Sequence, residues 1–222
     1  MKSKHTLLLL ILLCTAIVSI IDGIIMPGYV VKSAAKLVLF GLVPVLYARW
    51  AGIPLRGLLQ MEKRDLRRVL LLAAAIFSLI LGGYFVLRGF VDFSGISESL
   101  TTNAGVSREI FPFVAVYIPL VNALLEEFFF RGFAFLTLRR FFSAKFAYLY
   151  SAVVFAVYHV SILQGWFSPA IYALAMTGLA VGGLLFDWVD SRAESLLPSY
   201  LVHMSANLAI NTVGLILFGL IG

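Results

Sequence analysis

Seven stretches of mostly apolar residues dominate this chain of 222 residues and limit what it can fold into. A helix needs about 20 consecutive apolar residues to cross the hydrocarbon core of a bilayer. Inside that core, only helices and closed barrels satisfy all of their backbone polar groups. The sequence therefore predicts an all-α protein, a polytopic transmembrane helical bundle of about seven spans. The expected spans are Leu7–Ile25, Ala34–Tyr47, Val69–Leu87, Ile110–Leu138, Phe146–Leu163, Ala170–Phe186 and Leu197–Leu220.

Composition supports a single integral-membrane domain over residues 1–222. Hydrophobic residues make up 62% of the chain and charged residues only 13%, whereas about a quarter of the residues in a soluble domain are charged. The single cysteine, Cys14, excludes an intrachain disulfide and a zinc site built from cysteines. The net charge of +6 is typical of basic loops near anionic lipid, and we expect no nucleic-acid partner.

The distribution of Lys and Arg predicts a cytoplasmic N-terminus. With that orientation, twelve of the 17 basic residues fall on the cytoplasmic side, beginning with Lys2 and Lys4, and Arg131 is buried. The four on the outside are Lys32, Lys36, Arg88 and Arg108. Because cytoplasmic loops carry the excess of basic residues, we expect this orientation in the plasma membrane.

The composition of three loops predicts their structure. Residues 49–68 mix apolar and basic side chains, which predicts a short amphipathic element on the cytoplasmic surface. Residues 91–108 are rich in Ser, Thr and Gly, and we expect a flexible outer loop. Residues 187–194 contain Asp187 and Asp190, which we interpret as part of a solvated turn rather than a cation site.

The most unusual residues lie in the middle of the fourth span, where Glu126 and Glu127 are followed by Arg131. An ionisable side chain at this depth costs at least ~2.5 to 3.5 kcal/mol on insertion scales, so the pair indicates a functional site inside the membrane. In a helix, Glu127 and Arg131 share a face at i, i+4, which pairs their charges and leaves Glu126 free. The alternative is a structural ion cluster that only fixes helix packing.

Two histidines and an asparagine occupy other spans. His159 lies in the fifth span, and His203 and Asn207 share a face of the seventh at i, i+4. If these side chains converge with Glu126, that acid and His159 could activate a water molecule for attack on a peptide carbonyl. His203 and Asn207 could then donate hydrogen bonds to the developing oxyanion. The sequence offers no serine or cysteine nucleophile with a base beside it.

A metal ion is the alternative activator of water. Two histidines and one glutamate resemble a catalytic zinc shell, and the ligands would then be Glu126, His159 and His203. The sequence lacks the His-Glu-x-x-His helix that places two ligands on one face, so the three ligands would come from separate helices. No cofactor is therefore certain, and Zn²⁺ stays open.

Three motifs follow one another along the second half of the chain: Glu126-Glu127-x-x-x-Arg131, Phe155-x-x-x-His159 and His203-x-x-x-Asn207. In this order they resemble the motifs of the CPBP (Abi) intramembrane proteases. That family includes the CAAX prenyl endopeptidases and proteins linked to bacteriocin processing and self-immunity. The resemblance covers a protease core from about residue 110 to residue 222 and leaves the first three spans unmatched.

The resemblance implies an intramembrane endopeptidase of the glutamate or metal-dependent type. Its expected partners are membrane lipid and a substrate that is a hydrophobic, prenylated or bacteriocin-like peptide or protein. The residue roles that it implies are Glu126 as the water-activating base assisted by His159, His203 and Asn207 as the oxyanion-stabilising pair, and Glu127 with Arg131 as the supporting ion pair.

Two other functions remain open at this stage. A non-catalytic immunity or scaffold protein could keep the same fold and bind a peptide or partner. A proton-coupled transporter would also place Glu and His in its spans, but the sequence shows neither inverted repeats nor paired broken helices.

Overall fold

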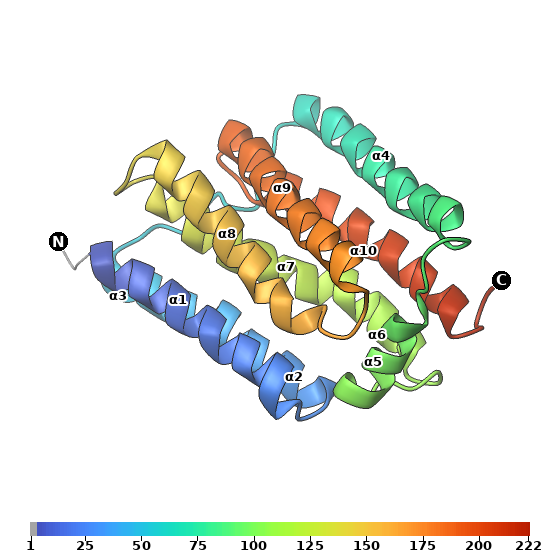
Figure 1. Cartoon of the computed structure of the whole chain (residues 1–222). Helices are drawn as coiled ribbons and strands as arrows, with labels where there is room; N and C mark the ends of the chain where they lie inside the picture. The colour runs from blue at the N-terminus through green and yellow to red at the C-terminus, as the bar shows by residue number, and fades with distance from the viewer. Residues whose placement is uncertain (1–3) are drawn as a thin grey trace.

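The computed structural model describes residues 4–222 except the side chain of Arg64, and Lys2 of the predicted orientation lies outside this range. The described chain is a helical bundle (Figure 1), with seven helices long and apolar enough to cross a membrane. They are Lys4–Ile25, Tyr29–Ala51, Asp65–Leu87, Phe111–Leu136, Ala144–Ile162, Pro169–Ala193 and Leu197–Leu217. The predicted all-α bundle of about seven spans is confirmed, and the chain has the architecture of an integral membrane protein.

Three of the spans combine α-helical and π-helical segments. The first joins α1 (Lys4–Ile20) to η1 (Ile21–Ile25), and the second joins α2 (Tyr29–Lys36), η2 (Leu37–Leu42) and α3 (Val43–Ala51). The fourth consists of α6 (Phe111–Tyr117), η3 (Ile118–Asn122), α7 (Ala123–Glu127) and η4 (Phe128–Leu136). The other spans lie in α4 (Lys63–Leu87), α8 (Ala144–Ile162), α9 (Pro169–Ala193) and α10 (Leu197–Leu217). π-Helical turns are frequent at functional sites, and here they flank α7, which carries both glutamates.

The fourth span lies in the middle of the bundle (Figure 1) and has the largest share of buried residues among the spans. Aromatic rings hold it there. Phe40 of η2 stacks on Phe129 with ring centroids 4.2 Å apart, and Tyr158 of α8 lies 5.5 Å from Phe130. All four rings are fully buried. Because each ring buries a large apolar area, this layer fixes the fourth span, at the start of η4, between the second and fifth spans.

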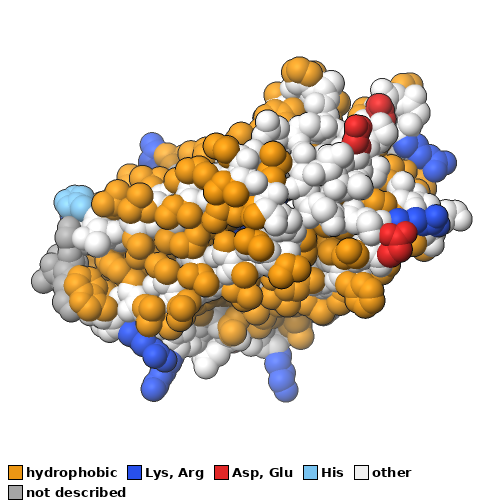
Figure 2. All heavy atoms as spheres, turned by 90° about the horizontal axis from the view of Figure 1, so that it is seen from below, with side chains coloured by type: hydrophobic (Ala, Val, Ile, Leu, Met, Phe, Trp, Pro, Cys, Tyr) orange, Lys and Arg blue, Asp and Glu red, His pale blue; other side chains and the backbone are white. Residues whose placement is uncertain are grey.

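The outer surface is also apolar. Leu9, Val30, Leu46 and Phe113 are each more than half exposed. Figure 2 shows hydrophobic side chains over most of the face seen from below, with Lys and Arg side chains at its margins. An apolar surface of this extent is typical of contact with lipid.

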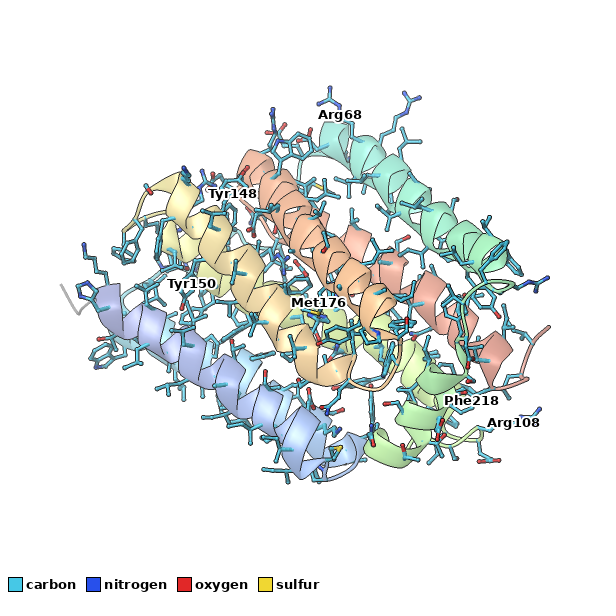
Figure 3. The ribbon with its side chains drawn as sticks, in the orientation of Figure 1. Arg68, Arg108, Tyr148, Tyr150, Met176 and Phe218 are labelled. Atoms are coloured by element: carbon cyan, nitrogen blue, oxygen red, sulfur yellow. The ribbon has the colours of Figure 1, made fainter. Side chains whose placement is uncertain are left out.

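The two ends of the bundle carry basic side chains from different loops. Arg68, near the start of α4, lies at one end, and Arg108, which precedes α6, lies at the other (Figure 3). The predicted orientation places Arg68 and Arg108 on opposite sides of the membrane, so it requires them to lie at opposite ends of the bundle. Which end faces the cytoplasm stays a prediction.

The sixth span is longer than the sequence indicated, and the expectation of a solvated turn at Asp187 and Asp190 is wrong. Both side chains are fully buried within α9, which continues to Ala193. Asp190 accepts hydrogen bonds from the backbone N–H and the hydroxyl of Ser199 at 2.9 and 2.7 Å. Because both carboxylates have partners inside the bundle, Ser151 and Arg131 for Asp187 and Ser199 for Asp190, the helix continues through them.

The second span is also longer than predicted. It begins at Tyr29 rather than Ala34, so Lys32 belongs to the helix, as does Lys36, which was also expected on the outer side. Lys36 points inward, with only 12% of its side chain exposed. The boundary was wrong because the sequence alone assigns Lys32 to water, while here its ammonium donates to the carbonyl oxygens of Asp22 and Asn103 at 3.0 and 3.1 Å.

The two long loops also differ from expectation. Residues 91–108 contain a helix, α5 (Ser94–Ala104). The Asp92 carboxylate accepts the backbone N–H of Ser94 at 2.8 Å, and this hydrogen bond lowers the pKa of Asp92. On the other side, where a short amphipathic element was predicted, residues 52–62 form turns and irregular backbone, and the Leu58 carbonyl accepts the hydroxyl of Ser195 at 2.7 Å. This loop is thereby tied to the residues that precede α10.

Candidate active site

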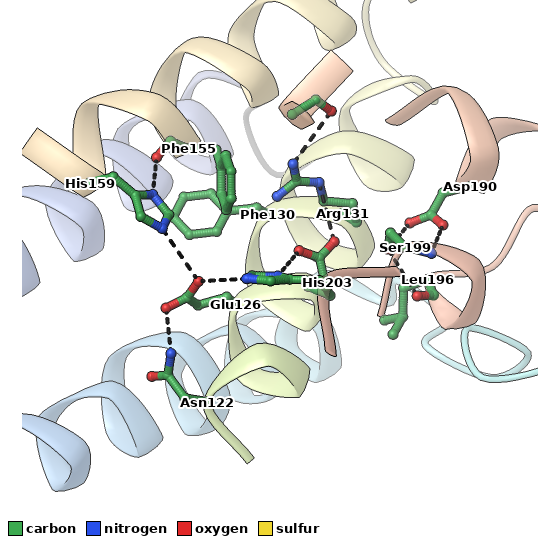
Figure 4. A network of polar contacts seen from close by, with 12 residues as sticks. Asn122, Glu126, Phe130, Arg131, Phe155, His159, Asp190, Leu196, Ser199 and His203 are labelled. Atoms are coloured by element: carbon green, nitrogen blue, oxygen red, sulfur yellow. Dashed lines mark hydrogen bonds and ion pairs between the residues drawn. The ribbon is translucent and has the colours of Figure 1, made fainter. Parts of the chain in front are cut away.

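Glu126 of α7 lies at the centre of the candidate site, with 2% of its surface exposed. Its Oε2 atom lies 3.9 Å from Nε2 of His159 on α8 and 3.8 Å from Nε2 of His203 on α10. Figure 4 shows both imidazoles directed at this one oxygen. The fourth, fifth and seventh spans thus bring together the carboxylate and the two imidazoles that the sequence analysis singled out.

The other carboxylate oxygen of Glu126 is occupied by hydrogen bonds. Its Oε1 atom accepts the Asn122 amide Nδ2–H at 2.7 Å and the Tyr158 hydroxyl at 3.2 Å. Both donors come from elements beside α7, namely η3 and α8. The two oxygens of Glu126 therefore differ, since Oε1 is held by protein donors and Oε2 faces the histidines.

Hydrogen bonds donated by the Nδ1–H groups fix the orientation of both imidazole rings. His159 Nδ1 lies 2.8 Å from the Phe155 carbonyl oxygen, and His203 Nδ1 lies 2.7 Å from Glu127 Oε1. A carbonyl or an ionised carboxylate can only accept a hydrogen bond, so each Nδ1 atom carries the proton. In a neutral ring, the Nε2 atom that faces Glu126 then has a free lone pair.

A buried ionic network lies behind His203. Arg131 Nε is 3.3 Å from Glu127 Oε2 and 3.5 Å from Asp187 Oδ1, and all three side chains are 0% exposed. Ser151 donates a hydrogen bond to Asp187 at 3.0 Å. The guanidinium also lies over the Phe155 ring, 4.1 Å from its centroid. The expected i, i+4 pair of Glu127 and Arg131 is present, and α9 adds a second acid to it.

A glycine lets α9 come close enough to join this network. Arg131 Nη2 donates to the Gly183 carbonyl at 3.4 Å. A Cβ atom at Gly183 would lie 3.1 Å from Ala152 Cα and 3.4 Å from Arg131 Nη2, which is closer than side-chain packing normally allows. The absence of a side chain at Gly183 therefore sets the spacing between α8 and α9.

Asn207 is the predicted site residue that joins this network least. It lies one turn after His203 on α10 and is half-buried, but no hydrogen bond links its amide to the described side chains around Glu126. Asn211, one turn further, is buried and donates to the Ala115 carbonyl at 2.9 Å. Asn211 therefore serves helix packing rather than the site.

Sequence reasoning missed three residues that contact the predicted ones. Asn122 and Tyr158 hold Glu126, and Asp187 contacts Arg131. Signals for the first two were present, because Asn122 precedes Glu126 by four residues and Tyr158 is adjacent to His159. Asp187 gave no local signal, since its partner lies in a different span.

The predicted zinc ligands fit a metal in donor type but not in arrangement. Glu126, His159 and His203 supply the oxygen and nitrogen donors of a catalytic zinc shell, and a zinc-bound histidine commonly donates its other N–H to an oxygen. Among residues 4–222, however, no group of three or more His, Cys, Asp or Glu side chains is placed to hold a metal ion.

Comparison with known proteins gives one family match. Residues 108–209, just under half of the chain, match the family described as type II CAAX prenyl endopeptidase Rce1-like. Comparison with curated proteins and with solved structures gives no match. The matched segment contains all three motifs and all six predicted site residues. The resemblance to the CPBP family is thereby confirmed over residues 108–209, through which this chain is similar to the type II CAAX prenyl endopeptidases.

Proposed function

We propose that this protein is an intramembrane endopeptidase that hydrolyses a peptide bond with a water molecule activated by Glu126. The observation that carries the proposal is the separation of 3.9 and 3.8 Å between Glu126 Oε2 and the two imidazole Nε2 atoms. These distances are too long for direct hydrogen bonds and suit one bridging water molecule. Glu126 offers that water an oxygen with no protein donor on it.

The proposed reaction has two steps. First, Glu126 Oε2 accepts a proton from water while the water oxygen bonds to the peptide carbonyl carbon. The His159 Nε2 lone pair accepts a hydrogen bond from the remaining water hydrogen and so orients the attack. The carbonyl π electrons move to the oxygen, which gives a tetrahedral oxyanion. Second, the C–N bond breaks, the oxyanion reforms a carbonyl, and Glu126 returns its proton to the leaving nitrogen. The products are a carboxylic acid and an amine.

His203 is the proposed main donor to the oxyanion. Its Nδ1–H is committed to Glu127 at 2.7 Å, so it donates through Nε2 only as an imidazolium. In that form it has one carboxylate on each side, Glu127 at 2.7 Å and Glu126 at 3.8 Å. Asn207, one turn along α10, would add its amide N–H when substrate binds. Each oxyanion donor is worth about 2.7 to 4 kcal/mol of transition-state stabilisation.

Glu127 and Arg131 are proposed to support this arrangement without touching the substrate. Arg131 balances the charges of Glu127 and Asp187 at 3.3 and 3.5 Å. With its charge balanced, Glu127 stays fixed as the acceptor for His203. The ring of His203 is then held in one orientation by the network behind it.

The proposed substrate is a hydrophobic or lipidated peptide or protein, of which a prenylated CAAX-type chain is the first choice. The similarity of residues 108–209 to type II CAAX prenyl endopeptidases supports this choice, and a bacteriocin-like peptide is the second choice. The apolar outer surface supports entry of the substrate from membrane lipid. We also propose the plasma membrane and a cytoplasmic N-terminus, supported by twelve of the 17 basic residues on that side.

Zinc is the second candidate for the activation of water. The observation in its favour is the donor set, since Glu126 Oε2 lies 3.9 and 3.8 Å from the two Nε2 atoms and each Nδ1–H is anchored on an oxygen. If zinc is bound there, it supplies a Lewis acid that activates water. Glu126, His159 and His203 are the residues that would hold it.

The test is cleavage of a panel of farnesylated, unprenylated and hydrophobic peptides by the detergent-purified protein. We expect cleavage by the wild type and loss of cleavage in Glu126→Gln, His159→Ala and His203→Ala, each shown to be folded by thermal unfolding. Cleavage that persists in Glu126→Gln would contradict the proposed base. If no peptide is cleaved while a biological phenotype survives in all three variants, the non-catalytic immunity or scaffold function is correct instead.

A further inference from the structure

Lys36 of α2 approaches the candidate site from the part of the chain that the family match does not cover. Its Nζ atom lies 3.5 Å from Asp22 Oδ2 on η1, and the two side chains are only 12% and 6% exposed. The same Nζ atom donates to Asn122 Oδ1 at 3.4 Å. The first two spans therefore supply an ion pair that contacts a neighbour of Glu126.

The contact continues through Asn122 to the proposed base. Asn122 accepts from Lys36 on its oxygen and donates to Glu126 Oε1 on its nitrogen at 2.7 Å. An ammonium group can only donate and an ionised carboxylate can only accept. Only one orientation of the Asn122 amide satisfies both neighbours, because a flipped amide would place donor against donor and oxygen against oxygen.

We propose that Lys36 is a positioning residue that acts on Glu126 through Asn122. Lys36 holds the amide in the orientation that directs Nδ2–H to Oε1, which fixes the rotation of the carboxylate and leaves Oε2 facing His159 and His203. The inference rests on the proposed function, since it assigns Lys36 to the geometry of the same base. It also explains why a lysine and an aspartate are buried in spans that lack the family motifs.

The competing explanation is that Lys36 serves only to neutralise Asp22. Lys32 offers a matched control, because it lies one turn earlier on the same helix. Its Nζ atom donates to the carbonyl oxygens of Asp22 and Asn103 at 3.0 and 3.1 Å. Within residues 4–222 no hydrogen bond or ion pair joins it to Asn122, so its loss removes a partly buried lysine from α2 and leaves the hydrogen bond from Lys36 to Asn122 in place.

The experiment measures kcat and KM for cleavage of a farnesylated peptide by Lys36→Met, Lys32→Met, Asn122→Ala and the double variant Asn122→Ala/Lys36→Met. We expect Lys36→Met to lower kcat about tenfold with KM within about twofold, as for a misplaced catalytic group. Lys32→Met should keep the wild-type kcat. In the Asn122→Ala background, Lys36→Met should cause little further loss, because the hydrogen-bonded path is already broken and only the contact of Lys36 with the Tyr158 ring, at 5.3 Å, remains.

Two more variants separate positioning from folding. Lys36→Arg keeps a donor toward Asn122 and should recover most of kcat. Asp22→Asn/Lys36→Met removes both charges of the ion pair, so it should fold even if Lys36→Met does not, and it should show the same loss of kcat. The inference is overturned if Lys36→Met keeps the wild-type kcat, or if it lowers kcat by the same factor with and without Asn122.

The same proteins distinguish failure of this inference from failure of the proposed function. If the wild type cleaves no peptide, the proposed function fails, and thermal unfolding then tests the contact itself. Lys36→Met and Asn122→Ala should have non-additive effects on Tm, while Lys32→Met and Asn122→Ala should be additive. Additive effects in both pairs would overturn the link between Lys36 and Asn122.

Discussion

His203 Nδ1 lies 2.7 Å from Glu127 Oε1, and the opposite ring nitrogen faces Glu126 at 3.8 Å. Two adjacent glutamates of one helix therefore reach opposite sides of the same imidazole. Glu127 also pairs with Arg131, which makes it an anchor. Glu126 instead meets neutral donors on one oxygen and the two histidines on the other. The pair thus divides into one acid that holds a histidine and one that is available for proton transfer.

This division predicts different outcomes for two equivalent substitutions. Glu126→Gln should lower kcat by about 100- to 10,000-fold, the range for general-base catalysis, with little change in Tm. Glu127→Gln should reduce stability strongly, because it removes one partner of a buried ion pair, a loss of about 3 to 5 kcal/mol. Peptide cleavage and thermal unfolding of both variants check this, and equal effects on Tm would contradict the division.

Arg131 should be needed to balance two acids rather than one. Arg131→Met leaves Glu127 and Asp187 buried without a cation, so we expect a large fall in Tm. The double variant Arg131→Met/Asp187→Asn removes one of the two acids as well and should recover part of that loss. Thermal unfolding in detergent gives the comparison. A double variant less stable than Arg131→Met would show that Asp187 does not share the charge of Arg131.

Tyr158 should contribute to catalysis through Glu126. Tyr158→Phe removes the hydroxyl that lies 3.2 Å from Oε1, and hydrogen bonds to charged groups are worth about 1.5 to 3 kcal/mol. We expect kcat to fall by roughly 10- to 100-fold on that scale. Tyr148→Phe is the control, because its hydroxyl is on the same helix but bonds to Ser191 at 2.8 Å. The account requires that only the first variant lowers kcat.

Gly183 should not tolerate even an added methyl group. In Gly183→Ala the new Cβ would lie 3.1 Å from Ala152 Cα, which pushes α9 away from α8, and overpacking of this kind costs about 1 to 3 kcal/mol. A Cβ at Gly182 would meet nothing within 4 Å, so Gly182→Ala should keep the wild-type Tm. If both variants unfold at the same temperature, close packing at Gly183 does not stabilise the bundle.

The fold and part of the site follow from local sequence patterns. Spanning helices depend on the apolar character of about 20 consecutive residues, so the count of seven could be read from the sequence. The contact of Glu127 with Arg131 depends on a spacing of four residues in one helix. The convergence of His159 and His203 on Glu126 depends on three spans, and only the resemblance to a family indicated it.

The residues that were missed depend on partners far away in the sequence. Lys36 and Asp187 each pair with an opposite charge in another span, Asp22 and Arg131 respectively. A charged residue seen without its partner indicates the end of a span, and for this reason the predicted second span began after Lys32 and the sixth ended before Asp187. Tertiary contacts of charged side chains decide both boundaries.

The most direct test of the account is the cleavage rate of a farnesylated peptide by purified wild type and Glu126→Gln, each with and without a metal chelator. The account predicts a rate that the chelator leaves unchanged and that Glu126→Gln abolishes. A rate that the chelator removes and added Zn²⁺ restores would contradict direct activation of water by the glutamate and would make Glu126 a metal ligand. Cleavage by Glu126→Gln at the wild-type rate would contradict the central role of Glu126 altogether.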